Sequence, residues 1–473
     1  MEHLSKLNQK YLLVPKFLYL SLSAAFYMFH QFRSQFIFDR YGMEKDKLGL
    51  YLSIPQAISF FSNIWIGSIN DRSGKQKMII LGLLVTSAMF FQSFFFSNSL
   101  VLFWINFTFY FVLLSATLPL LDKVMLDYVS EIPGMGSKAF GTQRLWSTFG
   151  YLITNFAVEH VIATDDKDTQ NYDNMQYFNI FVVGIASVFI YLFVKNLPRR
   201  TTSSDYINSV KALLRNFEYV YFIFIILLCG ISRAFMTNYL GFYYSKVLKF
   251  NDQKSPFRLF WPLNLLVDAA YDHKQSTSTM FGVALEIVVF YHSSLVTDKL
   301  GFFWPILLSQ IFQLSRFLSY YTLTYDNPNS FAICCLIELL KGANYSLIHT
   351  SALQLANSFC PPYLRTTSQL IYNGVFVAVG TVLSGLIFKS FFTKGVEDVD
   401  LSYSEFNSAF KWNIYFSIVG ICFFIYKYGV RENLLFNKEN AERKIRDIER
   451  IAKREEAEET EHQQPQQPKA EVK

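Results

Sequence analysis

The sequence predicts an all-α membrane protein with twelve transmembrane helices in two six-helix bundles. Hydrophobic residues make up 52% of the 473 residues and charged residues only 17%, which is too little polar surface for a water-soluble protein of this size. The apolar residues gather in runs of about 20, a length that crosses roughly 30 Å of hydrocarbon. One short motif also occurs once in each half of the chain, which indicates an internal repeat.

Twelve apolar runs have the required length. They cover approximately residues 14–35, 47–68, 78–97, 100–127, 140–161, 176–195, 218–246, 279–297, 302–323, 330–357, 366–391 and 408–429. Polar or charged stretches separate the runs, as short loops between spanning helices require. The pattern therefore predicts twelve spans.

The runs divide the chain into four parts. Residues 1–195 form an N-terminal six-helix bundle, 196–217 a polar and basic cytosolic linker, 218–430 a C-terminal six-helix bundle, and 431–473 a charged tail. Acidic and basic residues four apart predict a cytosolic helix in the tail to about Glu461, and the Gln- and Pro-rich end predicts disorder. The tail is either simply solvated or docks on a cytosolic partner.

Lys and Arg are more frequent in the loops and terminal stretches on one side of the membrane than on the other. Cytosolic loops are usually the more basic ones, so we expect both termini in the cytosol. We expect the plasma membrane rather than a vacuolar or other internal membrane. The segment 249–278 complicates this orientation, since Phe257–Tyr271 is apolar but interrupted by Pro262 and Asp268. It is short for a span and more typical of an interfacial segment or pore cap, whereas a thirteenth span would move the tail to the opposite side.

The repeated motif reads small-x-x-x-Asp-basic-x-Gly and lies between two apolar runs in each half. Its residues are Gly67, Asp71, Arg72 and Gly74 in the first copy and Asp298, Lys299 and Gly301 in the second, which begins with Ser294. We expect each copy to act as a gate that holds neighbouring helix ends together through hydrogen bonds and helix-end electrostatics. The alternative is a plain tight turn with solvated charges.

Ionisable side chains within the spans are costly, so each is paired or functional. Among those in the predicted spans are Asp122, Asp127, Arg144, Arg233, Glu286, Arg316, Glu338, Lys341 and His349. Glu286 is the strongest proton-carrier candidate, because burial disfavours its ionised form and an approaching guanidinium favours it. Arg316 is its expected partner, either as a movable switch or as a static salt bridge.

Glu338 and Lys341 lie three residues apart on one helical face and either neutralise each other or serve a binding site. His349 lies eleven residues after Glu338, close to three helical turns, so it faces nearly the same side. It is either a proton carrier or a hydrogen-bonded packing residue. Asp122 and Arg144 can pair across the hairpin between the fourth and fifth spans and clamp a polar solute. Trp146 either stacks on that solute or anchors the helix at the lipid interface.

These residues resemble those of the major facilitator superfamily, and most closely its lactose-permease-like branch, which includes phenylpropionate-type permeases. The resemblance rests on both loop motifs with Lys75 and Lys77, and on Leu118–Asp122, Phe140–Gly150, Glu286, Arg316, Leu340–His349 and Leu364–Gly374. It covers about residues 14–430 and implies two six-helix bundles around a central cavity. It also implies proton coupling through Glu286, Arg316 and His349.

Sugar-type recognition by Asp122 and Arg144 is a further implication of the resemblance. The chain departs from the family pattern at Ser294, where Gly is usual, and at Lys341, where relatives often carry His. The long 249–278 segment is also atypical. We place Lys341 in the substrate-binding set with Asp122, Arg144 and Trp146.

Two functional classes follow. The first is a secondary active transporter that couples protons to symport of a polar organic solute (a sugar, nucleoside or organic acid) by alternating access. The second is a transporter-fold sensor or scaffold that does not transport. The sequence has no phosphate-binding Gly-rich loop of an ATP-driven pump and no nucleophile–base set of an enzyme. It has no metal-ligand spacing among its five cysteines and no basic patch for nucleic acid, so we expect neither cofactor nor metal.

Overall fold

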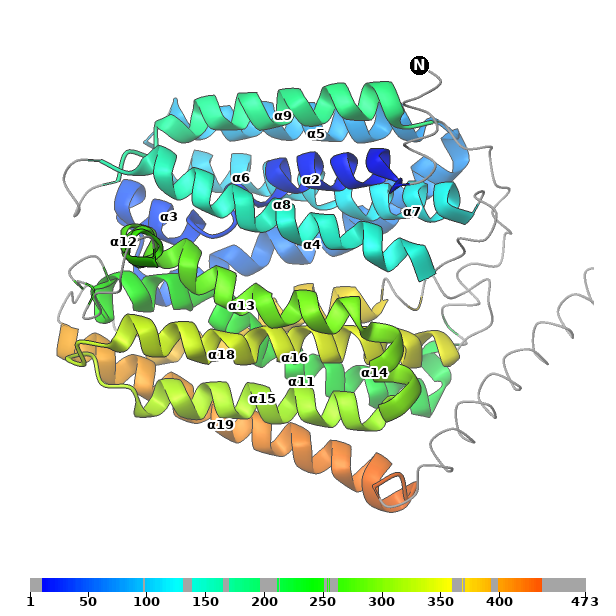
Figure 1. Ribbon diagram of the computed structural model, residues 1–473, viewed down its shortest axis with the longest axis vertical. Helices are drawn as coiled ribbons and strands as arrows, with labels where there is room; N and C mark the ends of the chain where they lie inside the picture. Colours follow the sequence, from blue (N-terminus) through cyan, green and yellow to red (C-terminus); the bar gives the residue numbers. More distant parts are fainter. Residues whose placement is uncertain are drawn as a thin grey trace, which may run out of the picture.

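The computed structural model describes residues 11–96, 98–130, 138–164, 170–195, 211, 213–250, 253, 255, 263–359, 368, 371–392 and 399–435. These residues are almost entirely helical; one isolated bridge joins Ala163 to Gln170. Most helices lie side by side and run across the longest axis of the molecule, with the first half of the chain above and the second half below in Figure 1.

The described helices of the first half are α2 (Leu13–Tyr27), α3 (Arg33–Tyr41), α4 (Lys45–Ser73), α5 (Gln76–Gln92), α6 (Leu100–Ser115), α7 (Thr117–Ser130), α8 (Lys138–Ile162) and α9 (Asn174–Phe193). Those of the second half are α11 (Phe217–Phe242), α12 (Leu263–Asp272), α13 (Lys274–Tyr291), α14 (Ser293–Leu300), α15 (Phe303–Thr322), α16 (Ser330–Ser358), α18 (Gly380–Phe388) and α19 (Val399–Phe424). Short π-helical segments extend α11 to Val247 and α19 to Arg431, and another, Gly374–Val379, precedes α18.

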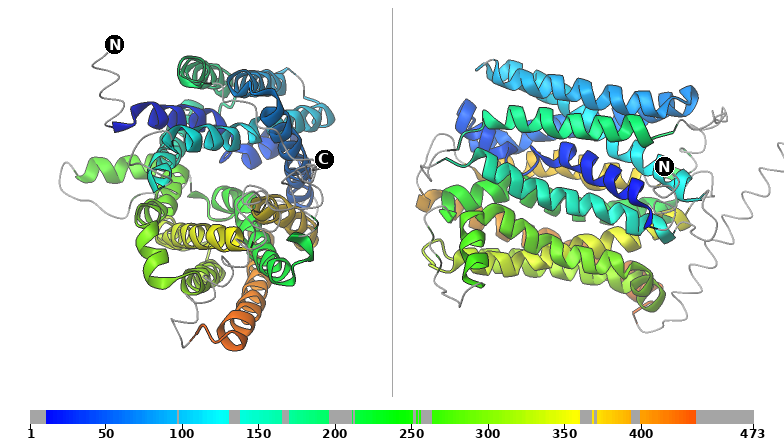
Figure 2. Two further views of the ribbon diagram at one scale, coloured as in Figure 1. Left: turned by 90° about the vertical axis from the view of Figure 1, so that its right-hand side faces the viewer. Right: turned by 45° about the horizontal axis from the view of Figure 1, so that its top comes forward.

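Each half has its own hydrophobic core. Buried side chains between Leu18 and Val194 form one cluster, and those between Leu213 and Leu434 form two. The second view of the molecule shows the same separation of the two halves (Figure 2). The predicted linker lies largely outside the described residues, as do the tail helix and the Gln- and Pro-rich end.

Seven of the described helices are long and apolar enough to cross a membrane by length and composition. They cover Gln76–Phe95, Leu100–Met125, Asn174–Phe193, Phe217–Val247, Ser330–Ala352, Ile371–Phe391 and Asp400–Arg431. The other predicted spans correspond to α2 with α3, α4, α8, α13 with α14, and α15. Polar residues or breaks interrupt these helices, and several of those polar residues lie in the candidate site.

Three predicted spans are not continuous. The span expected at 14–35 is divided by a turn at residues 28–32, which contains neither proline nor glycine. The span expected at 100–127 is divided at Ala116, between α6 and α7. The span expected at 279–297 is divided at His292, between α13 and α14. The first break brings polar residues to the middle of the molecule, because α3 begins there at Arg33.

The described part of the 249–278 segment is not a further span. Helix α12 has ten residues, so it is about 15 Å long, half of the hydrocarbon thickness. It is seen end-on in Figure 1 and projects sideways from the bundle in Figure 2, across the direction of the spans. Its Leu265 and Leu266 are exposed. This geometry fits an interfacial helix.

Candidate solute-binding chamber

Asp122 and Arg144 form the predicted pair on the inner side of the first half. Nη2 of Arg144, on α8, lies 3.2 Å from Oδ2 of Asp122, on α7. The hydroxyl of Tyr19, on α2, donates a hydrogen bond of 2.8 Å to the other carboxylate oxygen. The Arg144 side chain is 45% exposed. Its guanidinium therefore retains donors that can reach a solute.

Glu286 faces this pair from the second half. It lies on α13, where the charges of Lys341 and Arg144 both act on it. Tyr345 lies within electrostatic range of Glu286, Arg144 and Asp122, so its ring borders the same space. Among the described side chains, none forms an ion pair with Glu286 within 4 Å. Residues of both halves thus approach one another here, and we call the region that they surround the chamber.

A close helix crossing fixes the position of Glu286. A Cβ atom added to Gly342, on α16, would lie 2.6 Å from the carbonyl oxygen of Gly282 and 2.9 Å from the backbone nitrogen of Glu286. Only glycine permits this approach of α13 to α16. The crossing places Glu286 next to the helix that carries Lys341 and Tyr345.

The expected partnership of Arg316 with Glu286 is wrong. Nη2 and Nε of Arg316 donate to Oε1 of Glu338, at 2.6 and 3.1 Å, between the adjacent helices α15 and α16. Tyr320 donates to the same oxygen at 2.7 Å. Both charged side chains are almost completely buried. The nearer carboxylate satisfies the guanidinium, so Arg316 is not available to Glu286 in this structure.

The alternative in which Lys341 neutralises Glu338 is at most a minor contribution. Nζ of Lys341 is 3.9 Å from Oε2 of Glu338, well beyond the distance of Arg316. One third of the Lys341 side chain is exposed, and its charge also acts on Glu286. Lys341 therefore belongs to the chamber.

His349 lies on α16 among aromatic rings. Its Nδ1 is 3.2 Å from the hydroxyl of Tyr372, and its ring stacks on Tyr345 with centroids 5.3 Å apart. The structure does not bring Glu286, Arg316 and His349 into one contact cluster. The position of His349 agrees with the alternative of a hydrogen-bonded packing residue.

Trp146 does not stack in the chamber. Its ring packs against the core of the first half, and Nζ of Lys16 lies 5.5 Å from the ring centroid. Trp146 follows Arg144 by two residues, which turns it by about 200° to the opposite face of α8. In this structure Trp146 and Arg144 therefore face different sides of α8, and a role of Trp146 in solute binding stays a prediction.

Sequence reasoning missed Arg33 and gave no role to Arg233, which it had placed among the charges within the spans. Arg33 begins α3 at the break in the first span, and Nη2 of Arg33 donates to Oδ1 of Asn238, on α11, at 3.0 Å. Arg233 lies over the ring of Phe376, 5.0 Å from its centroid. The charges of Arg33, Arg233 and Lys341 all act on His30. Arg33 lies in a predicted span, so the rule on intramembrane charges could have found it.

Hydrogen bonds between the halves close one end of the chamber, the end at which α3 finishes and α12 lies; we call it the far end. Both carboxylate oxygens of Glu159, near the end of α8, accept backbone N–H groups of Gln275 and Ser276, at 3.2 and 2.8 Å. These donors are the first turn of α13, whose positive end favours a carboxylate. Nε2 of Gln275 donates to Oε1 of Gln35 at 3.1 Å.

The repeated motifs lie at helix ends opposite the far end. Gly74 ends α4 with φ 65°, and Gly301 follows α14 with φ 63°, so both glycines hold the left-handed conformation at equivalent points of the two halves. Gly67 has open space around its Cα, and Lys299 is exposed. The backbones of Asp71, Arg72 and Asp298 are helical, but their side chains lie outside the described residues.

A family model confirms what this architecture indicates. The model of the MFS_1 like family matches residues 12–396. The chain belongs to this family of the major facilitator superfamily. It is therefore a multi-pass membrane transporter for a small solute, not an enzyme. A search of curated protein sequences found no significant match.

Solved structures of major facilitator transporters share the fold. A mutant of the nucleoside transporter NupG is 14% identical, with a TM-score of 0.70 over 87% of this chain and 98% of that one. The peptide transporter PepTSo2 is 13% identical, with a TM-score of 0.65 over 89% and 98% of the two chains. A bacterial homologue of the human lysosomal transporter Spinster, in an inward-facing and unoccupied conformation, is 10% identical. Its TM-score is 0.63 over 88% of this chain and 96% of that one.

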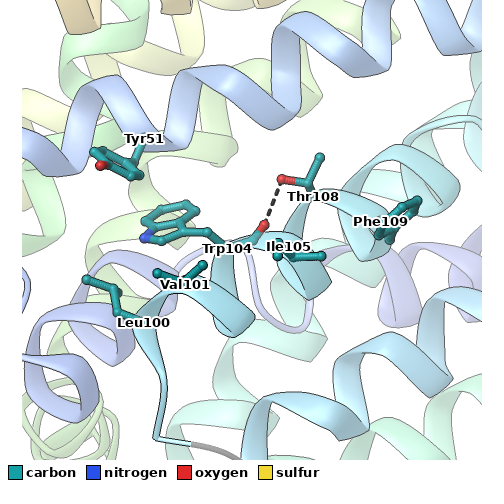
Figure 3. A pocket seen from close by; sticks show the side chains of 7 residues that line it. All are labelled: Tyr51, Leu100, Val101, Trp104, Ile105, Thr108 and Phe109. Atoms are coloured by element: carbon teal, nitrogen blue, oxygen red, sulfur yellow. Dashed lines mark hydrogen bonds between the residues drawn. The ribbon is translucent and has the colours of Figure 1, made fainter.

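The MFS_1 like chain also has an apolar groove on its outer surface, between α4 and α6. The groove has a volume of about 490 Å³ and is lined by Tyr51, Leu100, Val101, Trp104, Ile105, Thr108 and Phe109 (Figure 3). The hydroxyl of Thr108 donates to the carbonyl of Trp104 at 2.7 Å, so it is already engaged within its own helix. The lining suits contact with lipid chains rather than with a polar solute.

Proposed function

We propose that the protein is a proton-coupled symporter that moves a polar organic solute by alternating access. The observation that carries the proposal is the position of Glu286, which faces the Asp122–Arg144 pair across the chamber and has no ion pair of its own among the described side chains. A carboxyl without a fixed cation can take up and release a proton as nearby charges move.

In this proposal, Asp122, Arg144 and Lys341 bind the solute and Glu286 carries the proton. The resemblance to the lactose-permease-like branch supports Glu286, Arg316 and His349 as a coupling set. The geometry supports Glu286 directly, whereas Arg316 would act through Glu338 and His349 through Tyr345. The solute class comprises sugars, nucleosides and organic acids.

The same proposal gives the structure an orientation. With both termini in the cytosol of a plasma-membrane protein, the far end faces outward and is closed by Glu159. The two predicted bundles, 1–195 and 218–430, would rock about the chamber, and the motifs at Asp71 and Asp298 would join helix ends when the chamber opens outward. Asp71→Asn should then lower turnover more than binding; equal losses would argue against a gate.

Proton coupling is tested in proteoliposomes that contain a pH-sensitive dye. Inward gradients of glucose, uridine, succinate and glucose 6-phosphate are applied in turn, and the active solute should acidify the lumen. Glu286→Gln should abolish this acidification while exchange of the same labelled solute continues. Glu218→Gln is the matched control, because Glu218 pairs with Lys427 at the end of α11, away from the chamber. Unchanged acidification in Glu286→Gln would refute the proposal.

A further inference from the structure

We propose that the solute is an organic anion, recognised through its carboxylate or phosphate group by guanidinium groups of Arg33, Arg144 and Arg233. The inference rests on the proposed function, in that it takes the chamber as the transport site. It narrows the solute class from polar molecules in general to anions.

The chamber has more cations than carboxylates. Arg33, Arg144, Arg233 and Lys341 carry four positive charges, against Asp122 and Glu286, among the residues that the structure describes. The Arg316–Glu338 pair adds nothing to this balance, because its two buried charges cancel. A proton on Glu286 would increase the excess of positive charge.

Arg33 has no carboxylate to neutralise it in the described part of the chain. It is only 3% exposed, its Nη2 binds the amide oxygen of Asn238, and its Nε is buried without a hydrogen-bond partner. An amide oxygen satisfies one donor but leaves the charge uncompensated. A buried guanidinium in this state is unfavourable unless an anion approaches it.

Arg233 is in the same condition on the opposite side. Its guanidinium carbon lies over the ring of Phe376, 5.0 Å from the centroid, and its Nε is buried and without a hydrogen-bond partner. Its helix is held there, since a Cβ atom on Gly230 would lie 2.6 Å from the carbonyl oxygen of Phe376. A guanidinium that contacts an aromatic ring can still donate two hydrogen bonds to an anion through its edge.

The two guanidinium groups also act on each other. The positive charges of Arg33 and Arg233 lie within electrostatic range of one another, and both reach His30. Like charges brought together in a chamber between bundles repel each other, and a bound anion removes that repulsion. A neutral sugar or nucleoside would leave the repulsion in place. A monoanion carried with one proton would cross the membrane without net charge.

The proposal is tested by thermal unfolding of the full-length protein in lipid nanodiscs, without any gradient. Succinate and glucose 6-phosphate represent the carboxylate and phosphate sources, glucose and uridine are neutral, and choline is cationic. At least one of the two anions should raise the midpoint of unfolding in the millimolar range. Glucose 6-phosphate against glucose is the matched comparison.

Variants link the effect to the chamber. Arg233→Gln and Arg33→Gln should each weaken the binding of the stabilising anion by at least tenfold, and Arg233→Lys should restore part of it. Arg40→Gln is the control, since it removes the same charge from a pair with Asp173 at the far end. Because the measurement needs no transport, it is independent of whether Glu286 couples protons.

Three results would overturn the inference. They are stabilisation by glucose or uridine equal to that by the anions, absence of stabilisation by both anions, and anion binding unchanged in Arg233→Gln and Arg33→Gln. If an anion binds but Glu286→Gln still acidifies the lumen, only the proposal of proton coupling through Glu286 is refuted. If a neutral solute drives acidification, the protein is still a proton symporter and only the inference of an anionic solute is refuted.

Discussion

Arg316 pairs with Glu338 at 2.6 Å rather than with Glu286. Its guanidinium therefore binds a carboxylate of α16 and not the expected proton carrier on α13. Removing one partner of such a buried pair leaves the other charge uncompensated. We expect Glu338→Gln to lower the free energy of unfolding by about 3–5 kcal/mol. Chemical denaturation in mixed micelles measures this loss.

The double variant Arg316→Met/Glu338→Leu removes both charges and should recover most of that stability. Glu286→Gln should change stability little, because Glu286 forms no ion pair with a described side chain. Equal losses in Glu286→Gln and Glu338→Gln would contradict the assignment of partners.

Breaking the Asp122–Arg144 pair should lower solute uptake much more than it lowers stability. Its side chains are 21% and 45% exposed, so Asp122→Asn should cost less than about 1 kcal/mol of stability. Solute uptake should nevertheless fall at least tenfold, since the variant carboxamide no longer holds the guanidinium or accepts both hydrogen bonds. Uptake normalised to the amount of folded protein is the measurement. Tyr19→Phe, which removes one hydrogen bond to Asp122, should give an intermediate loss.

Acid should loosen the far end through His273. This residue precedes α13, and burial and the nearby His160 lower the pKa of His273 below 6.5, although Asp272 opposes the shift. Opening of the far end would restore the ordinary pKa, so opening takes up a proton. The closed state therefore loses stability as the pH falls below about 6.5, and not above it.

The groups around His273 are Glu159, His160, Asp272 and Lys274, with the ring of Phe156. Spin labels at Asn171→Cys and Asp268→Cys, in a cysteine-free background, should report a larger open fraction at pH 5.5 than at pH 7.5. His273→Gln should flatten this dependence, whereas His292→Gln, at the other end of α13, should preserve it. A dependence that survives in His273→Gln would assign it to another group.

The motif glycines should respond to alanine with opposite signs. Gly74 and Gly301 have φ of 65° and 63°, so Gly74→Ala and Gly301→Ala should each cost about 1–2 kcal/mol. Gly67 lies inside α4 with open space around it, so Gly67→Ala should stabilise by about 0.5–1 kcal/mol. Thermal unfolding of the three variants checks the contrast. A stabilised Gly301→Ala would show that the turn does not need the left-handed conformation.

The spans could be predicted because each one is a long apolar run, and the length of the run determines whether a helix can cross the bilayer. The Asp122–Arg144 pair could be predicted because the residues lie on consecutive spans. The break at residues 28–32 could not, since it contains neither proline nor glycine. Arg33 could therefore be recognised as a charge within a predicted span, but not as the first residue of a separate helix.

The partner of Arg316 could not be chosen from sequence. Glu286 and Glu338 are both carboxylates within predicted spans of the second half, and only the packing of α15 against α16 selects Glu338. The position of Trp146 was predictable, because two residues on a helix turn a side chain away from its neighbour. Asp71, Arg72 and Asp298 remain predictions, since their side chains lie outside the described residues.

The glycine contact between α13 and α16 joins Glu286 and Lys341 into a single mechanical part. Because the two backbones are in contact, we expect α13 and α16 to move together, which would keep the spacing of this acid and this base constant. In the proposed transport cycle, a change in the proton affinity of Glu286 would then come from the opposite bundle, through movement of Arg144.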